Sequence, residues 1–247
     1  MEKANKKIDL SGFEMKDELN PKIWDGDKMK PEVRKTLLKI ADDYFESLDL
    51  DVDIEDITMT GSLANYNWSK YSDVDLHIVI NYSDLDMDEN LVGDYLTSKS
   101  DAWGEKHDIT IYGFEVEVFI QDSEGEHHSS GVYSVLNDEW DIKPEKMVVS
   151  VNDKSVKDKA NLIMDKIESL YDLMVDTKDY EKITKLADKL KKKIKKMRQC
   201  GLEKGGEWSV ENIVFKVLRR NGMYGRLRDI KTIAYDKSLT LENKGYL

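Results

Sequence analysis

The sequence predicts an α+β protein, with a sheet flanked by helices in residues 1–150 and a helical domain in residues 151–247. Strands with alternating apolar residues are indicated within 57–80 and 109–120, and helical spacing of apolar residues precedes and separates them. After residue 151, apolar residues recur at helical spacing. Together these observations indicate two domains, with a boundary near Pro144 and the polar segment that follows it.

Each element follows from a local pattern. A helix is expected over 31–48, because its apolar residues recur at helical spacing and Pro31 suits a first turn. A strand over 57–60, a Gly61-Ser62 turn, a loop of ten residues and a strand carrying Asp73 and Asp75 follow. The remaining expected elements are a helix over 88–103, strands over 109–112 and 114–120, a hairpin turning at Asn137-Asp138, helices around 160–174 and 183–197, a helix over 209–220 with Ser209 as its N-cap, and a short helix after 222.

The segment 57–80 carries the residues with the clearest chemistry. Side chains alternate along a strand, so Asp73 and Asp75 share a face and lie about 7 Å apart along the backbone. Two neighbouring carboxylates repel each other unless a cation lies between them, and Mg²⁺ is bound by carboxylates together with substrate phosphates. Gly61 lets a ligand approach the main chain, and Ser62 offers a hydroxyl and the start of a short helix. This order of elements indicates phosphoryl or nucleotidyl transfer.

A Gly-Ser pair, ten residues and then Asp-x-Asp between apolar strands resembles the signature of the DNA polymerase beta superfamily of nucleotidyltransferases. Uncharacterised phage and prokaryotic enzymes of this superfamily look most similar over the whole chain. The resemblance implies a nucleotidyltransferase-type mixed sheet flanked by helices in a catalytic domain, residues 1–150, followed by a C-terminal helical domain, residues 151–247.

The resemblance also implies a third carboxylate on a strand beside the Asp-x-Asp strand. Glu117, flanked by Val116 and Val118, matches this position best. Glu115 on the same face and Asp122 just beyond the strand are the alternatives. The family position is more often aspartate, so a glutamate here is a departure from the pattern that leaves the metal geometry open.

The activity implied is transfer of a nucleoside monophosphate from an NTP, with ATP favoured, to a hydroxyl acceptor with release of pyrophosphate. In the family's two-metal mechanism, Asp73, Asp75 and Glu117 would hold two Mg²⁺ ions, or Mn²⁺, while Gly61 and Ser62 would bind the β and γ phosphates. The acceptor stays open between an RNA or tRNA 3′ end, a small molecule, a protein hydroxyl and a second nucleotide, which would give cyclic or oligonucleotide products. A non-catalytic nucleotide-binding module and a purely structural component are the alternatives from other classes.

Two further groups are candidates for nucleotide contacts. In the loop, Tyr66 is a candidate to stack on the base and Lys70 to contact phosphate, although Tyr66 is equally suited to pack the turn against the domain. Lys216, Arg219 and Arg220 share one side of the helix 209–220, and the resembled architecture implies that they offer cations to the triphosphate or the acceptor.

Charge is divided unevenly along the chain, whose net charge is −12. Residues 1–150 contain 15 Lys and Arg against 35 Asp and Glu, whereas residues 151–247 contain 23 against 15. This division fits metal-binding chemistry in the first part and phosphate contact in the second. The lysine-rich segment 188–198 is interpreted first as a solvated face, with RNA contact as the alternative.

Localisation is expected to be cytoplasmic, in the host cytoplasm if the protein is viral. The single cysteine, Cys200, excludes an internal disulfide and fits a reducing compartment. No apolar run approaches the ~20 residues needed to cross a bilayer. The sequence therefore predicts no membrane association, and it leaves the oligomeric state open.

Overall fold

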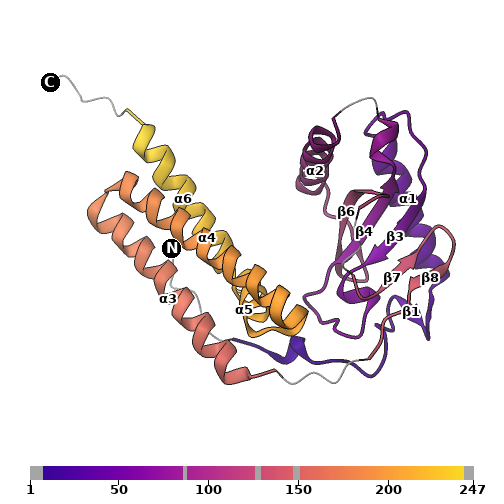
Figure 1. Cartoon of the computed structure of the whole chain (residues 1–247), viewed down its shortest axis with the longest axis horizontal. Coiled ribbons are helices and arrows are strands. Elements are labelled where there is room, and N and C mark those ends of the chain that lie inside the picture. Colours follow the sequence, from indigo (N-terminus) through magenta and orange to yellow (C-terminus); the bar gives the residue numbers. More distant parts are fainter. Residues whose placement is uncertain (1–7, 86–87, 126–128, 147–150, 242–247) are drawn as a thin grey trace. The chain divides into compact units, whose positions relative to one another are not determined.

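The computed structural model describes residues 8–85, 88–125, 129–146 and 151–241. The chain divides into two compact units (Figure 1): Gly12–Val148, here the sheet unit, and Val149–Leu247 with Met1–Ser11, here the helical unit. The sheet unit contains a mixed six-stranded sheet with helices, and the helical unit contains four α-helices. The predicted α+β class is confirmed.

The elements of the sheet unit follow one another in a simple order. They are β1 (Trp24–Asp25), β2 (Lys28–Met29), α1 (Pro31–Glu46), β3 (Asp56–Thr60), β4 (Val74–Ile80), α2 (Glu89–Lys106), β5 (Thr110–Ile111), β6 (Phe114–Asp122), β7 (Val132–Ser134) and β8 (Glu139–Ile142). The six-stranded sheet has the order β5-β6-β4-β3-β7-β8. Its strands pair antiparallel except β4 and β6, which are parallel. The strand that carries the Asp-x-Asp motif therefore lies inside the sheet, between β3 and β6.

The two faces of this sheet differ because the strands alternate. One face contributes Ile57, Leu76 and Val118 to the hydrophobic core, together with their neighbours two residues away along each strand. Both α1 and α2 pack on this core, and they touch each other where Tyr44 Oη lies 2.9 Å from Ser100 Oγ. The opposite face carries the polar residues of the central strands, and the candidate site lies on it.

A short β1–β2 hairpin, which the sequence pattern does not predict, supports one end of the sheet. Gly26 turns this hairpin with φ of 63°, and each strand has only two residues, too few to show alternation. Trp24 stacks on Trp140 of β8 at 4.7 Å and meets Tyr133 of β7 edge-on at 4.9 Å. This aromatic group ties the N-terminal segment to the edge of the sheet.

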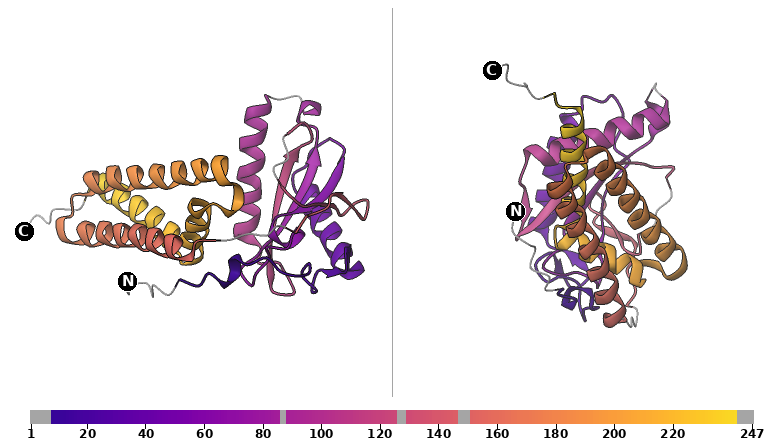
Figure 2. Two further views of the ribbon diagram at one scale, coloured as in Figure 1. Left: turned by 60° about the horizontal axis from the view of Figure 1, so that its bottom comes forward. Right: turned by 90° about the vertical axis from the view of Figure 1, so that its left-hand side faces the viewer.

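The helical unit is built from α3 (Asp153–Thr177), α4 (Tyr180–Gly205), α5 (Val210–Arg220) and α6 (Met223–Leu239). Figure 2 shows α3 and α4 as a pair of long helices, and both contact α5 and α6. Ser209 caps α5 as predicted, its hydroxyl accepting from Asn212 N at 3.3 Å. The prediction of a short last helix is wrong in length, because α6 has 17 residues. One side of α6 is buried against the other helices. No helix among the described residues combines the length and hydropathy that crossing a membrane requires.

Candidate metal centre

Three carboxylates, carried by β4, by the residue before it and by β6, meet on the polar face of the sheet. Asp73 immediately precedes β4, Asp75 is the second residue of β4, and Glu117 is the fourth residue of β6. Each offers a carboxylate oxygen, and these oxygens all lie within 4.8 Å of one another. All three residues are half-buried. The expected strand is shorter than predicted by one residue, since Asp73 lies outside β4, yet its carboxylate still joins the group.

Strand register accounts for this grouping. In the parallel pair, Val74 is opposite Val116, Asp75 opposite Glu117 and Leu76 opposite Val118. The apolar partners point into the core, so the two acids between them emerge together on the other face. Burial of the flanking residues therefore fixes which acids stand side by side.

Gly61 lies directly against the Asp75 carboxylate. It directly follows β3 and has φ of 76°, a region that residues with a side chain rarely adopt. A Cβ atom built on Gly61 would lie 1.7 Å from Asp75 Oδ2, far inside any permitted contact. Glycine is thus required here for two independent reasons, backbone conformation and the space that the carboxylate occupies.

Ser62 begins the short helix that the sequence predicts, a single 3₁₀ turn over Ser62–Ala64. Its hydroxyl lies 2.7 Å from Ser72 Oγ, at the far end of the ten-residue loop. Ser72 Oγ in turn accepts from Ser69 N at 2.9 Å. Ser72 was not predicted as part of the site, although its position directly before Asp73 is a signal that could have indicated it.

The turn after Gly61 is held by contacts from distant parts of the sheet unit. Trp24 Nε1 donates to Leu63 O at 2.7 Å, and Asn65 Nδ2 donates to Ser130 Oγ at 2.7 Å. Gly131 packs so closely that a Cβ there would lie 2.1 Å from Ala64 O. These contacts fix the turn before any ligand binds.

The alternatives for the third carboxylate are placed differently. Glu115 is exposed and lies two residues before Glu117 on β6, outside the group of close carboxylates. Asp122 Oδ1 accepts from Tyr82 N at 3.2 Å and Glu124 N at 3.4 Å in the turn that follows β6. Of the three candidates, Glu117 is the one that the structure brings to Asp73 and Asp75.

Tyr66 and Lys70, the predicted base and phosphate contacts in the loop, are not members of the carboxylate group. Tyr66 is half-buried and packs against the hydrophobic core, with Lys146 Nζ 5.2 Å from its ring centre. Lys70 is exposed, and its ammonium lies 4.9 Å from the ring centre of Tyr71. Their roles in nucleotide binding stay predictions.

The predicted cations Lys216, Arg219 and Arg220 belong to α5, in the helical unit, whereas the carboxylates belong to the sheet unit. Arg219 is exposed, while Lys216 and Arg220 are half-buried. Their contact with a triphosphate or an acceptor also stays a prediction.

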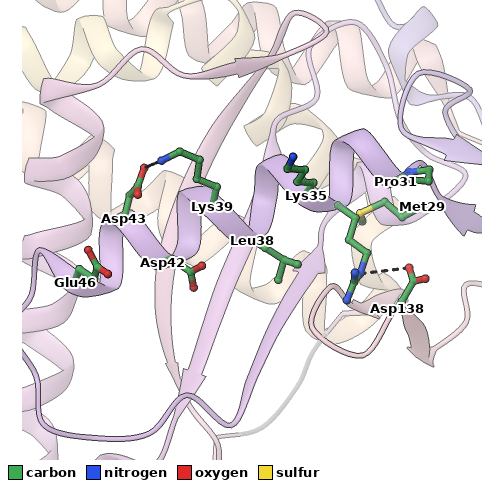
Figure 3. Close-up of a pocket in the computed structure, with 10 residues that line it drawn as sticks. Met29, Pro31, Lys35, Leu38, Lys39, Asp42, Asp43, Glu46 and Asp138 are labelled. Carbon is green, nitrogen blue, oxygen red and sulfur yellow. Dashed lines mark hydrogen bonds and ion pairs between the residues drawn. The ribbon is translucent and has the colours of Figure 1, made fainter.

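A hollow of about 530 Å³ lies along α1 (Figure 3). Its lining consists of Met29, Pro31, Arg34, Lys35, Leu38, Lys39, Asp42, Asp43, Glu46 and Asp138. Arg34 is already engaged at one end, donating to the carbonyls of Val135 at 2.8 Å and Leu136 at 2.7 Å. None of the predicted site residues lines this hollow, so it gives no support to the nucleotide site.

The donor set at the carboxylate group consists entirely of oxygen atoms, which suits a hard divalent cation such as Mg²⁺ or Mn²⁺. Burial of three like charges at this separation is unfavourable without a cation, so the residues present fit the metal that the resemblance implies. Comparisons of the chain with protein-family models, with curated proteins and with solved structures give no match.

Proposed function

We propose that the protein is a metal-dependent nucleotidyltransferase of the DNA polymerase beta type, moving a nucleoside monophosphate from an NTP to a hydroxyl acceptor. One observation carries the proposal: Asp73, Asp75 and Glu117 present oxygens within 4.8 Å of one another beside a glycine-serine turn. The Gly61 contact with Asp75 adds support, because it joins the turn and the acids into one site.

In this proposal each residue has a defined task. Asp73, Asp75 and Glu117 hold Mg²⁺, which when bound neutralises phosphate charge and lowers the pKa of a coordinated hydroxyl. Gly61 allows the triphosphate to approach the main chain, and the Ser62 hydroxyl donates to a phosphate oxygen. Glu117 accepts the proton of the acceptor hydroxyl while the oxygen of that hydroxyl attacks the α-phosphorus. The bond between that phosphorus and the bridging oxygen breaks, and pyrophosphate leaves with the electron pair.

The test is incorporation of label from α-phosphate-labelled NTPs, with ATP tried first, in the presence of Mg²⁺ and of RNA, protein, small-molecule or no added acceptor. Asp73→Asn and Asp75→Asn should each lower the rate at least about 100-fold, because the charge that holds the cation is removed. The melting temperature of both variants should stay the same or rise, since repulsion between carboxylates is relieved.

The matched control is Asp51→Asn, which removes an exposed carboxylate in the segment before β3 and should leave the rate unchanged. Near-normal turnover in either Asp73→Asn or Asp75→Asn would refute the assignment of the site. Mg²⁺-dependent NTP binding without pyrophosphate release under every acceptor condition would instead indicate a non-catalytic nucleotide-binding module.

A further inference from the structure

One face of α4 carries a row of exposed lysines, here the lysine stripe. Its members are Lys182, Lys185, Lys189, Lys192, Lys193 and Lys196. With 3.6 residues per turn, these side chains fall within an arc of about 100° around the helix, and the row runs for about 21 Å along its axis. The stripe is therefore a line of positive charge, and Lys191 and Lys195 lie outside its arc.

The rest of the helical unit fixes which way the stripe faces. Ile183, Ala187 and Ile194, on the opposite side of α4, are all at most 1% exposed. Since α4 packs against α5 and α6, this buried side anchors the helix within the unit. The stripe consequently faces away from the core of the helical unit.

Acidic residues are few within the segment of α4 that carries the stripe. Residues 182–196 contain eight lysines and a single acid, Asp188. Asp188 pairs with Lys231 of α6 at 2.7 Å, and that pairing is the main cause of its lowered pKa, to which the charges of Lys192 and Lys191 add a smaller share. Among the described residues, no ion pair within 4.0 Å involves a lysine of the stripe.

Within the stripe, lysines three and four residues apart are neighbours on the helix surface and repel one another. A surface that serves solubility alone intersperses the two signs of charge and avoids this repulsion. A bound polyanion would relieve the repulsion along the whole row, which indicates a ligand with regularly repeated negative charges.

We infer that the lysine stripe binds the phosphate backbone of a polynucleotide, with RNA as the ligand to test first. Lysines act as point charges toward phosphate and give affinity without reading bases, which matches a row that lacks aromatic and amide side chains. A membrane surface fits less well, because the apolar side that an interfacial helix would insert is buried inside the unit. A protein partner fits less well too, since lysine is depleted in protein interfaces.

This inference rests on the proposed function in one respect, that the bound polynucleotide would be the acceptor. Binding of a polynucleotide by the stripe can be measured without any transfer reaction. Residues 1–150 carry 20 more acidic than basic residues, and such a negative region repels a polynucleotide. A polynucleotide acceptor would therefore require cations from the helical unit, where the stripe is their longest row on one helix face among the described residues.

The experiment measures the affinity of the full chain for a fluorescent single-stranded RNA of about 20 nucleotides, by anisotropy, as salt is raised from about 50 to 200 mM. The test variant is Lys185→Gln, Lys189→Gln, Lys192→Gln and Lys196→Gln combined. Glutamine removes the charge and keeps helix propensity. We expect the dissociation constant to rise at least tenfold, and the slope of log K against log salt to fall in magnitude by about 3.

The control variant removes the same charge from exposed lysines elsewhere in the helical unit, with Lys154→Gln, Lys157→Gln, Lys166→Gln and Lys237→Gln combined. It should change RNA affinity less than about threefold. Equal losses in the two variants would overturn the inference in favour of a general charge effect, and so would absence of RNA binding by the unmutated chain at about 50 mM salt. Unchanged melting temperatures, followed by circular dichroism, show that both variants fold.

Two further arms separate the alternatives. Vesicles containing phosphatidylserine should bind weakly and without difference between the two variants, and a loss confined to the stripe variant there would overturn the assignment to a polynucleotide. Asp75→Asn should retain RNA binding, so a failure of nucleotide transfer and a failure of RNA binding are distinguished by separate measurements.

Discussion

The two units of the chain place their charges in opposite ways. In the sheet unit, Asp73, Asp75 and Glu117 converge from adjacent strands on a region smaller than 5 Å. In the helical unit, the lysine stripe spreads its charge along about four turns of one helix. Convergence needs strand register, turn geometry and a glycine, whereas a stripe needs only a helix with the right spacing.

This difference has a consequence for mutation. A convergent site depends on every member, because removing one acid changes the charge and geometry felt by the others. A distributed surface depends on its sum, so each lysine contributes a small and roughly equal share.

Replacement of the third carboxylate tests convergence most sharply. Glu117→Gln should lower nucleotide incorporation at least about 100-fold if the proposed function is right, because in it Glu117 is both a metal ligand and the group that accepts the proton. Glu115→Gln changes the neighbouring acid on the same face and should lower incorporation less than about threefold. Incorporation is measured at saturating Mg²⁺ and NTP. If the Glu115 variant were the inactive one, β6 would be shifted by two residues in register against β4.

Gly61→Ala tests the contact between the turn and Asp75. The added Cβ overlaps Asp75 Oδ2, so the carboxylate must move, and we expect activity to fall at least tenfold and the protein to lose about 2 kcal/mol of stability. Gly26→Ala is a matched control, since Gly26 also has a positive φ but nothing within 4 Å of the added atom. It should cost about 1 kcal/mol and no activity. Equal losses of activity in the two variants would contradict a specific clash.

Alkaline pH tests the stability of the sheet unit at a position outside the carboxylate group. Burial, together with the hydrogen bond that Tyr133 Oη donates to Asp138 at 2.7 Å, raises the pKa of Tyr133 to about 12. A raised pKa means that the folded protein favours the protonated phenol. This contribution is complete below pH 10 and is lost as the pH rises from 10 to 12, with about 1 kcal/mol lost by pH 11. Urea unfolding followed by tryptophan fluorescence measures it, and Tyr133→Phe should show a smaller decline over the same interval.

Much of the fold could be predicted from local pattern. The period of two in 57–60 and 114–120 indicates β3 and β6, and the caps and apolar stripes indicate the helices. The predicted turn at Asn137-Asp138 connects β7 and β8, where Asp138 has φ of 60°. The β1–β2 hairpin and the length of α6 were not predicted, because the first is too short to show a period and the second depends on packing against the other helices.

The candidate site could be predicted only in part, because its members join through non-local contacts. That Asp73 and Asp75 share a face follows from alternation alone. The choice of Glu117 over Glu115 depends on Val74 pairing with Val116, and a shift by two residues would preserve the local pattern of β6. The hydrogen bond between the Ser62 and Ser72 hydroxyls likewise joins the two ends of a ten-residue loop, and no local sequence pattern predicts the path of that loop.

The position of β4 between β3 and β6 makes the strand that carries Asp75 one of the most protected parts of the sheet unit. Amides of a strand paired on both sides exchange with solvent through the largest opening events of a domain, so those of β4 should be among the slowest in the sheet unit. The carboxylate oxygens already lie within 4.8 Å of one another, so the cation of the proposed function would meet a group of ligands that is in place before it binds.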